Sequence, residues 1–290
     1  MRKWLRIVVW SAGVLAVAGV GVASAEWLLV RRTPEWYAAD TRTPAQRSSA
    51  ADRAEDTLIR LYNWSAGHHA RQVAARTRPF AFNPPAGEST YPLSFTDGQL
   101  NAFIDRWSDF QDRRAIIEQS VHDPRLIVQG GQIILAGQVK EMGLVVSLFV
   151  LPQVSPGGRL HLTLDKVVAG VVPVPDAFFA TQRASLERVL ASNLPADQAA
   201  ARLDADGLAN GPAATAAMDE MLLAMLRRRP AEPVIFVPVN TSASSPLLPL
   251  RITAVTADDH VLTLTAQAMA QDERQQLLSR IKSPDQPTEP

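Results

Sequence analysis

Residues 144–151 carry apolar side chains at both alternating sets of positions, and Ser147 is the one polar member of the run. A strand with one solvated face alternates apolar and polar residues, so this pattern predicts a strand that is buried on both faces. Such burial is typical of parallel sheets, but no crossover helix separates this segment from its neighbours. We therefore expect an antiparallel strand whose second face is covered by another layer of protein or by an apolar ligand.

Other extended segments surround this strand. Gly130-Gly131 separates two of them and is a strong two-residue hairpin signal. Another segment, 159–168, alternates cleanly between apolar and polar residues, as a half-buried antiparallel strand does. The predicted strands are 125–129, 132–139, 143–154, 159–168, 234–239, 250–257 and 260–267.

Helical spacing of apolar residues predicts helices between and around these strands. The sharpest helix start is at Thr96 and Gln99, which form a capping box, with Phe95 and Leu100 placed for a hydrophobic staple. The predicted helices are 50–76, 96–119, 176–192, 212–229 and 269–281.

Runs of strands separated by runs of helices indicate an α+β fold. We expect an N-terminal transmembrane helix followed by a curved antiparallel sheet packed on amphipathic helices. The expected organisation is 1–32 as a cytoplasmic stub and transmembrane anchor or signal peptide, 33–90 as a linker and helical stalk, 91–282 as an extracytoplasmic α+β domain, and 283–290 as a disordered tail.

The N-terminal prediction depends on residues 7–25, which are 19 consecutive uncharged positions. As a helix they would span roughly 28 Å, close to the thickness of a bilayer's hydrocarbon core. Arg2, Lys3 and Arg6 precede this run, so the short N-terminus is expected to stay cytoplasmic. Ala23-Ser24-Ala25 leaves a cleaved signal peptide as the alternative. Both readings export the rest of the chain, and an uncleaved anchor attaches it to the membrane through residues 7–30.

Composition excludes several classes of protein. The chain has 290 residues with 29 basic and 29 acidic side chains and no cysteine. Cysteine-based catalysis, cysteine zinc sites and iron–sulfur clusters are therefore excluded. After Arg32 the chain carries 24 basic and 28 acidic residues, so we expect no nucleic-acid partner.

No familiar catalytic or metal motif is present. The histidine pair His68-His69 reads best as solvated helix positions, and His122-Asp123-Pro124 as a helix end. His161 and Asp165 lie about 13 Å apart on one strand face, too far for a direct hydrogen bond. The pair Asp204 and Asp206 lacks the remaining ligands of a calcium loop. We expect no catalytic residue, no cofactor and no metal.

The expected ligand contacts are apolar. One set on the two-faced strand is Leu144, Val146, Leu148 and Val150, and the alternate set is Val145, Phe149 and Leu151. The pattern does not decide which set faces a ligand. A methionine stripe at Met218, Met221 and Met225 could line a pliable pocket, although helical spacing fits ordinary core as well. The residues predicted to contact ligand are Leu144, Val146, Leu148, Phe149, Val150, Met221 and Met225.

A family resemblance adds to this reading. The run Leu93-Ser94-Phe95-Thr96-Asp97-Gly98-Gln99-Leu100-Asn101 resembles the helix start of YpmS-like bacterial proteins, and the resemblance extends over about residues 91–190. It implies a single N-terminal membrane segment, an extracytoplasmic α+β domain and no enzymatic activity. The layout is also similar to that of lipid-binding envelope proteins.

Three functions remain open. The first is a membrane-anchored extracytoplasmic binding module for an apolar ligand, a lipid or lipid-linked precursor. The second is a non-enzymatic scaffold or assembly subunit of a cell-envelope complex, with a protein partner and no cavity. The third is an envelope hydrolase in which Asp97, Asp165 or His161 would have to converge in a cleft.

Overall fold

A computed structural model describes residues 29–37, 41–77, 89–106, 121–140, 142–238 and 246–282. Within these ranges the chain is α+β, as predicted, but its strands form two antiparallel sheets instead of one. The helices are α3 (Pro44–Thr77), α4 (Asp97–Arg106), α6 (Asp176–Ala200), α7 (Gly211–Leu226) and α8 (Gln271–Lys282). The N-terminal run that predicted a transmembrane helix lies outside the described residues. None of the described helices is long and apolar enough to cross a membrane.

The first sheet has the order β2-β3-β4-β5-β6 and is a meander. Its strands are β2 (Val121–Gln129), β3 (Gln132–Val139), β4 (Leu144–Val154), β5 (Leu160–Ala169) and β6 (Val172–Val174). Gly130 and Gly131 have φ angles of 59° and 80°, which confirms the predicted hairpin, since its turn needs two residues with positive φ. His122-Asp123-Pro124 lies at a bulge in β2, so its reading as a helix end was wrong.

The second sheet has the order β1-β9-β8-β7. Its strands are β1 (Thr90–Thr96), β7 (Val234–Pro238), β8 (Leu247–Asp258) and β9 (Val261–Ala268). Strand β1 was missed by the sequence analysis, although Leu93 and Phe95 are buried on one face. It is an edge strand, where Pro92 is tolerated because the missing N–H leaves no ladder bond broken.

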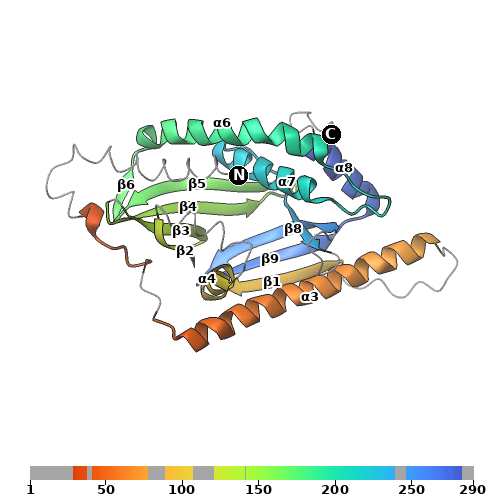
Figure 1. Ribbon diagram of the computed structural model, residues 1–290, viewed down its shortest axis with the longest axis horizontal. Helices are drawn as coiled ribbons and strands as arrows, with labels where there is room; N and C mark the ends of the chain where they lie inside the picture. Colours follow the sequence, from red (N-terminus) through yellow and green to blue (C-terminus); the bar gives the residue numbers. More distant parts are fainter. Residues whose placement is uncertain are drawn as a thin grey trace.

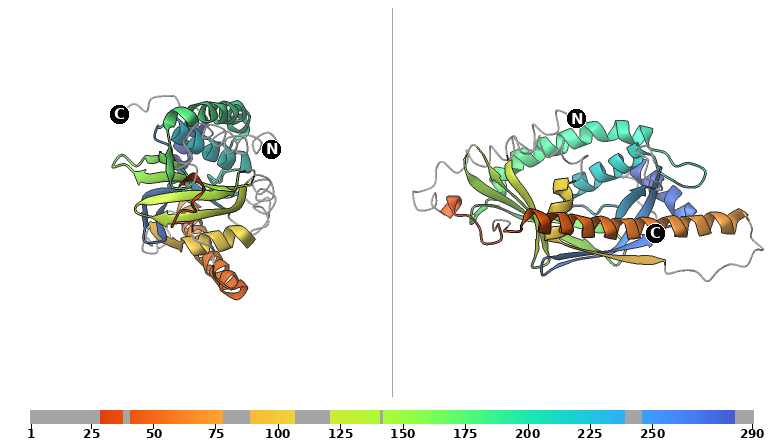
Figure 2. Two further views of the ribbon diagram at one scale, coloured as in Figure 1. Left: turned by 90° about the vertical axis from the view of Figure 1, so that its left-hand side faces the viewer. Right: turned by 60° about the horizontal axis from the view of Figure 1, so that its bottom comes forward.

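The helices cover the sheets from two sides (Figure 1). Helix α3 runs along the second sheet, and a core cluster joins its Leu61 to Leu93 of β1 and Leu250 of β8. Helices α6, α7 and α8 share another cluster, which includes Leu190, Leu223 and Leu277. Figure 2 shows that α3 and α6 lie on opposite sides of the molecule. The sheets therefore lie in the middle of the molecule.

Candidate functional site

The two faces of β4 have different surroundings. Val145 and Phe149 are buried in a cluster with Tyr37, and Trp36 packs against it. The ring of Trp36 lies edge-on to Phe149, with centroids 5.4 Å apart. This face of β4 is therefore covered by the segment that precedes α3, and the apolar excess on this side is explained without a ligand.

The other face of β4 is only partly covered. Leu144 and Val150 are buried, whereas Val146 and Leu148 are half-buried. Leu148 pairs directly with Leu135 of β3, which keeps 44% of its surface exposed. Because directly opposed residues share a face, Leu135, Val146 and Leu148 form one surface, called here the apolar strip. Of the two sets that the sequence left open, this one has two half-buried members, Val146 and Leu148, and the alternate set has one, Leu151.

The methionine stripe does not join the apolar strip into one cavity. Met218 is 43% exposed and Met221 is half-buried on α7. Met225 packs against the cluster between α6, α7 and α8, and it borders a small hollow beside β5 whose volume is about 10 Å³. That volume holds no more than a water molecule. Contact of Met221 and Met225 with a ligand stays a prediction.

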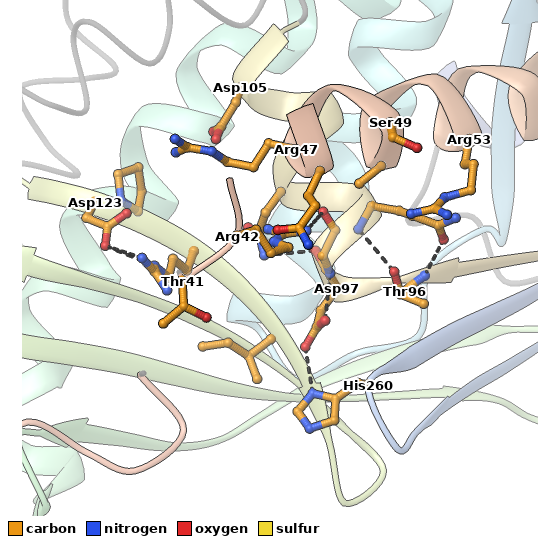
Figure 3. A pocket seen from close by; sticks show the side chains of 18 of the residues that line it. Thr41, Arg42, Arg47, Ser49, Arg53, Thr96, Asp97, Asp105, Asp123 and His260 are labelled. Carbon is orange, nitrogen blue, oxygen red and sulfur yellow. Dashed lines mark hydrogen bonds and ion pairs between the residues drawn. The ribbon is translucent and has the colours of Figure 1, made fainter. Parts of the chain in front are cut away.

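A much larger hollow lies beside the face of the first sheet that Trp36 covers, opposite the apolar strip. This open groove has a volume of about 1210 Å³, and it is bordered by the start of α3, the junction of β1 and α4, the start of β2 and the β8–β9 turn. Figure 3 shows polar side chains from these segments pointing into it. We call it the arginine groove, since Arg42, Arg47, Arg53 and Arg125 all line it.

The floor of the groove is the capped start of α4. The Thr96 amide donates to Gln99 Oε1 at 2.8 Å and the Gln99 amide donates to Thr96 Oγ1 at 3.1 Å, which confirms the predicted capping box. Gly98, which lies between these two residues, lets a guanidinium group approach closely. Arg42 Nη1 donates to the Gly98 carbonyl at 2.8 Å. A Cβ at this glycine would lie 2.6 Å from the same nitrogen.

One histidine joins three elements at the edge of the groove. The His260 amide donates to the Val128 carbonyl of β2, and the His260 carbonyl accepts from the Asp97 amide at the start of α4. Its Nδ1 also lies 2.7 Å from Asp97 Oδ2. The β8–β9 turn has positive φ at Asp259 and His260, which fits a two-residue hairpin turn. His260 was not predicted as a site residue, because the Asp97 carboxylate that it meets is 163 residues away in the sequence.

On the β2 side of the groove, the charged side chains of Arg125 and Asp123 pair with each other. Arg125 Nη2 lies 2.7 Å from Asp123 Oδ2, and its guanidinium lies over the ring of Tyr37. The Tyr37 hydroxyl donates to the Asp123 carbonyl at 2.7 Å. Burial, and then the negative charge of Asp123, raise the pKa of Tyr37 to about 12. The phenol therefore stays a hydrogen-bond donor at neutral pH.

The residues proposed for a hydrolase do not converge. Asp97 meets His260, whereas Asp165 accepts a hydrogen bond from Gln132 and His161 borders a separate shallow hollow. Among the described residues no group of three histidine, aspartate or glutamate side chains is placed to hold a metal. Asp204 instead accepts from the amides of Asp206 and Leu208, as a turn residue does.

The histidine pair on α3 differs from its prediction. His69 is buried, with its Nδ1 3.3 Å from Arg274 Nη1, so it is not solvated. His68 is half-buried beside Trp64, and burial, followed by the charges of Arg71 and Arg274, lowers its pKa. Among the described residues, the pair belongs to no group of three side chains that could hold a metal.

The fold and the two surfaces define an α+β protein with one apolar strip and one polar groove. No family model, curated protein or solved structure matches the chain. The resemblance to YpmS-like proteins stays a prediction.

Proposed function

We propose that this protein is a non-enzymatic binding module, held by its N-terminal segment in the cell membrane and displayed outside the cytoplasm, which binds an acyl or prenyl chain of a lipid or lipid-linked precursor. Residues 7–25 supply the anchor in this proposal. The observation that carries the ligand part is the apolar strip, where Leu135 and Leu148 lie side by side on an incompletely covered sheet face.

The size of the strip favours a lipid chain over a protein partner. A stable protein interface buries about 800 Å² on each side, which three aliphatic side chains do not supply. An extended hydrocarbon chain needs only a narrow row of apolar contacts, at about 0.8 kcal/mol per buried methylene. An anchor would also keep the strip next to a bilayer, where such chains are concentrated.

The competing function is a scaffold or assembly subunit of an envelope complex. It is favoured by the open form of the strip, because a lipid carrier usually encloses its ligand. In that case the exposed leucine of the strip would belong to a wider contact surface for a protein partner.

Native mass spectrometry of the full chain, extracted from membranes in a mild detergent, tests the proposal. We expect a co-purifying lipid mass that Leu148→Asp removes. The matched control is Ile59→Asp, which places the same charge on α3 at a side chain that is 48% exposed and far from the strip. A spectrum in which the whole protein population has the mass of the unliganded chain contradicts the lipid proposal. Crosslinking in intact cells that recovers one protein and no lipid supports the scaffold instead.

A further inference from the structure

The arginine groove is separate from the apolar strip, and its lining has an excess of positive charge. Four arginines face three aspartates, which are Asp97, Asp105 and Asp123. Two of these carboxylates have close local partners, since Asp123 pairs with Arg125 and Asp97 with His260.

Two of the arginines have no such partner. Arg47 and Arg53 lie on exposed positions of α3, and their guanidinium groups form no ion pair within the part of the chain that the structure describes. Both line the groove from the same helix. Exposed arginines with no ion pair among the described residues are available to an incoming ligand.

The start of α3 adds to the positive potential, whereas the start of α4 already carries Asp97, whose Oδ1 accepts from the Gly98 amide. Helix α3 begins beside the groove with a neutral capping box, in which the Thr43 amide donates to Gln46 Oε1 at 2.8 Å. Its first turn has no acidic residue, and Arg47 follows directly. A cation near a helix N-terminus opposes the helix dipole and costs some stability. An anion bound between α3 and α4 would relieve this repulsion.

The geometry points to the arginine groove as a binding site for a phosphate group, carried either by a lipid headgroup or by a free phosphate compound. Arginine binds phosphate through two parallel N–H···O bonds. The guanidinium groups of the groove therefore favour phosphate over chloride or another small anion. A groove of about 1210 Å³ has room for a diphosphate with a substituent. This inference does not depend on the apolar strip.

Calorimetric titration of the full chain in detergent with inorganic pyrophosphate tests the site. We expect saturable binding that Arg47→Gln and Arg53→Gln each weaken roughly tenfold, since each removes a charge-assisted contact. The matched control is Arg188→Gln, which removes an equal charge from an exposed position on α6 and should leave the affinity unchanged. Circular dichroism confirms that each variant keeps its fold.

A second arm uses vesicles of neutral lipid with and without an anionic phospholipid. Binding of the phospholipid vesicles that depends on Arg47 and Arg53, without pyrophosphate binding, assigns the phosphate to a lipid headgroup. Binding of pyrophosphate alone assigns it to a free compound. The inference is overturned if neither probe binds saturably, or if Arg188→Gln weakens binding as much as the groove variants do.

Discussion

The indole Nε1 of Trp36 donates a hydrogen bond to Ser147 Oγ at 3.2 Å, between residues that are 111 positions apart. Ser147 is fully buried and is the polar exception in the apolar run of β4. A buried hydroxyl needs a partner, and the indole N–H of the half-buried Trp36 supplies one. The serine therefore marks the place where the chain covers one face of its own sheet.

Removing this cover should destabilise the protein. Trp36→Ala deletes the edge-on contact with Phe149 and leaves Ser147 without its donor. We expect the free energy of unfolding in urea to fall by about 3 kcal/mol. The control Trp36→Phe keeps a ring but loses the hydrogen bond, and should cost about 1 kcal/mol. Equal midpoints for the alanine variant and the parent chain would show that this segment is not part of the core.

Asn101 of α4 should be needed to hold the edge of β2. Its Nδ2 donates to the Leu126 carbonyl at 2.6 Å, and its Oδ1 accepts from the Leu126 amide at 2.8 Å, as a neighbouring strand would. Asn101→Ala leaves both backbone groups unpaired, and we expect a loss of about 2 kcal/mol in the free energy of unfolding.

Asn101→Asp sharpens this test. An ionised carboxylate would face the Leu126 carbonyl, so this variant should be less stable than Asn101→Ala at neutral pH and should recover as acid protonates the side chain. Hydrogen exchange at the Leu126 amide measures the local effect. Unchanged protection in both variants would contradict the role of Asn101.

Features that depend on neighbouring residues were predictable, and those that join distant segments were not. The capping box at Thr96 and Gln99 and the turn at Gly130-Gly131 depend on residues a few positions apart, and both were correctly predicted. The cover that Trp36 gives β4 needs two segments that meet only in the folded chain. The segment 33–90 was expected to be a linker and helical stalk with its helix starting at residue 50, whereas Trp36 packs on the sheet and α3 begins at Pro44.

The arginine groove was missed for the same reason. It collects side chains from segments that lie far apart in the sequence, and no local motif contains them. By contrast, the alternation of Leu93 and Phe95 was a usable signal for β1, but Pro92 within the segment weakened that signal. The two-faced pattern of β4 correctly indicated burial of the face that carries Val145 and Phe149, whereas Val146 and Leu148 on the other face are only half-buried.

Gly98→Ala should separate the stability of the fold from binding in the arginine groove. The added Cβ would lie 2.6 Å from Arg42 Nη1, so this flexible guanidinium must move away from the Gly98 carbonyl. Alanine favours helix by up to about 1 kcal/mol, so the free energy of unfolding should not fall. We expect weaker pyrophosphate binding together with unchanged or higher stability. Unaltered affinity would show that Arg42 takes no part in binding the anion.

Arg274 should be irreplaceable by lysine. It is 1% exposed on α8, its Nε and Nη2 donate to the Met269 carbonyl, and its Nη1 donates to the Asp206 carbonyl at 3.2 Å. A lysine ammonium cannot reach these acceptors from one point, so we expect Arg274→Lys to lower the free energy of unfolding by about 2 kcal/mol. Thermal melts measure this loss. The control in these melts is Arg188→Lys, at an exposed position of α6. Identical melting of both variants would contradict the structural role.

Asp219 of α7 should make the protein less stable as pH rises. Burial, and then the negative charge of Asp197, raise the pKa of Asp219 from 3.8 to about 6. Between about pH 4 and pH 6 the unfolded chain therefore loses a proton that the folded chain retains, so this group's stabilising contribution is complete below about pH 4 and disappears by about pH 7.

The variant Asp219→Asn removes this titration. The difference in the free energy of unfolding between the variant and the parent chain should shift by roughly 2 kcal/mol in favour of the variant from pH 4 to pH 7. Asp197→Asn should remove only part of the pH dependence, because burial is the larger cause. Urea unfolding at a series of pH values measures both differences. Parallel curves for Asp219→Asn and the parent chain would show that the carboxyl titrates at its ordinary pKa in the folded protein.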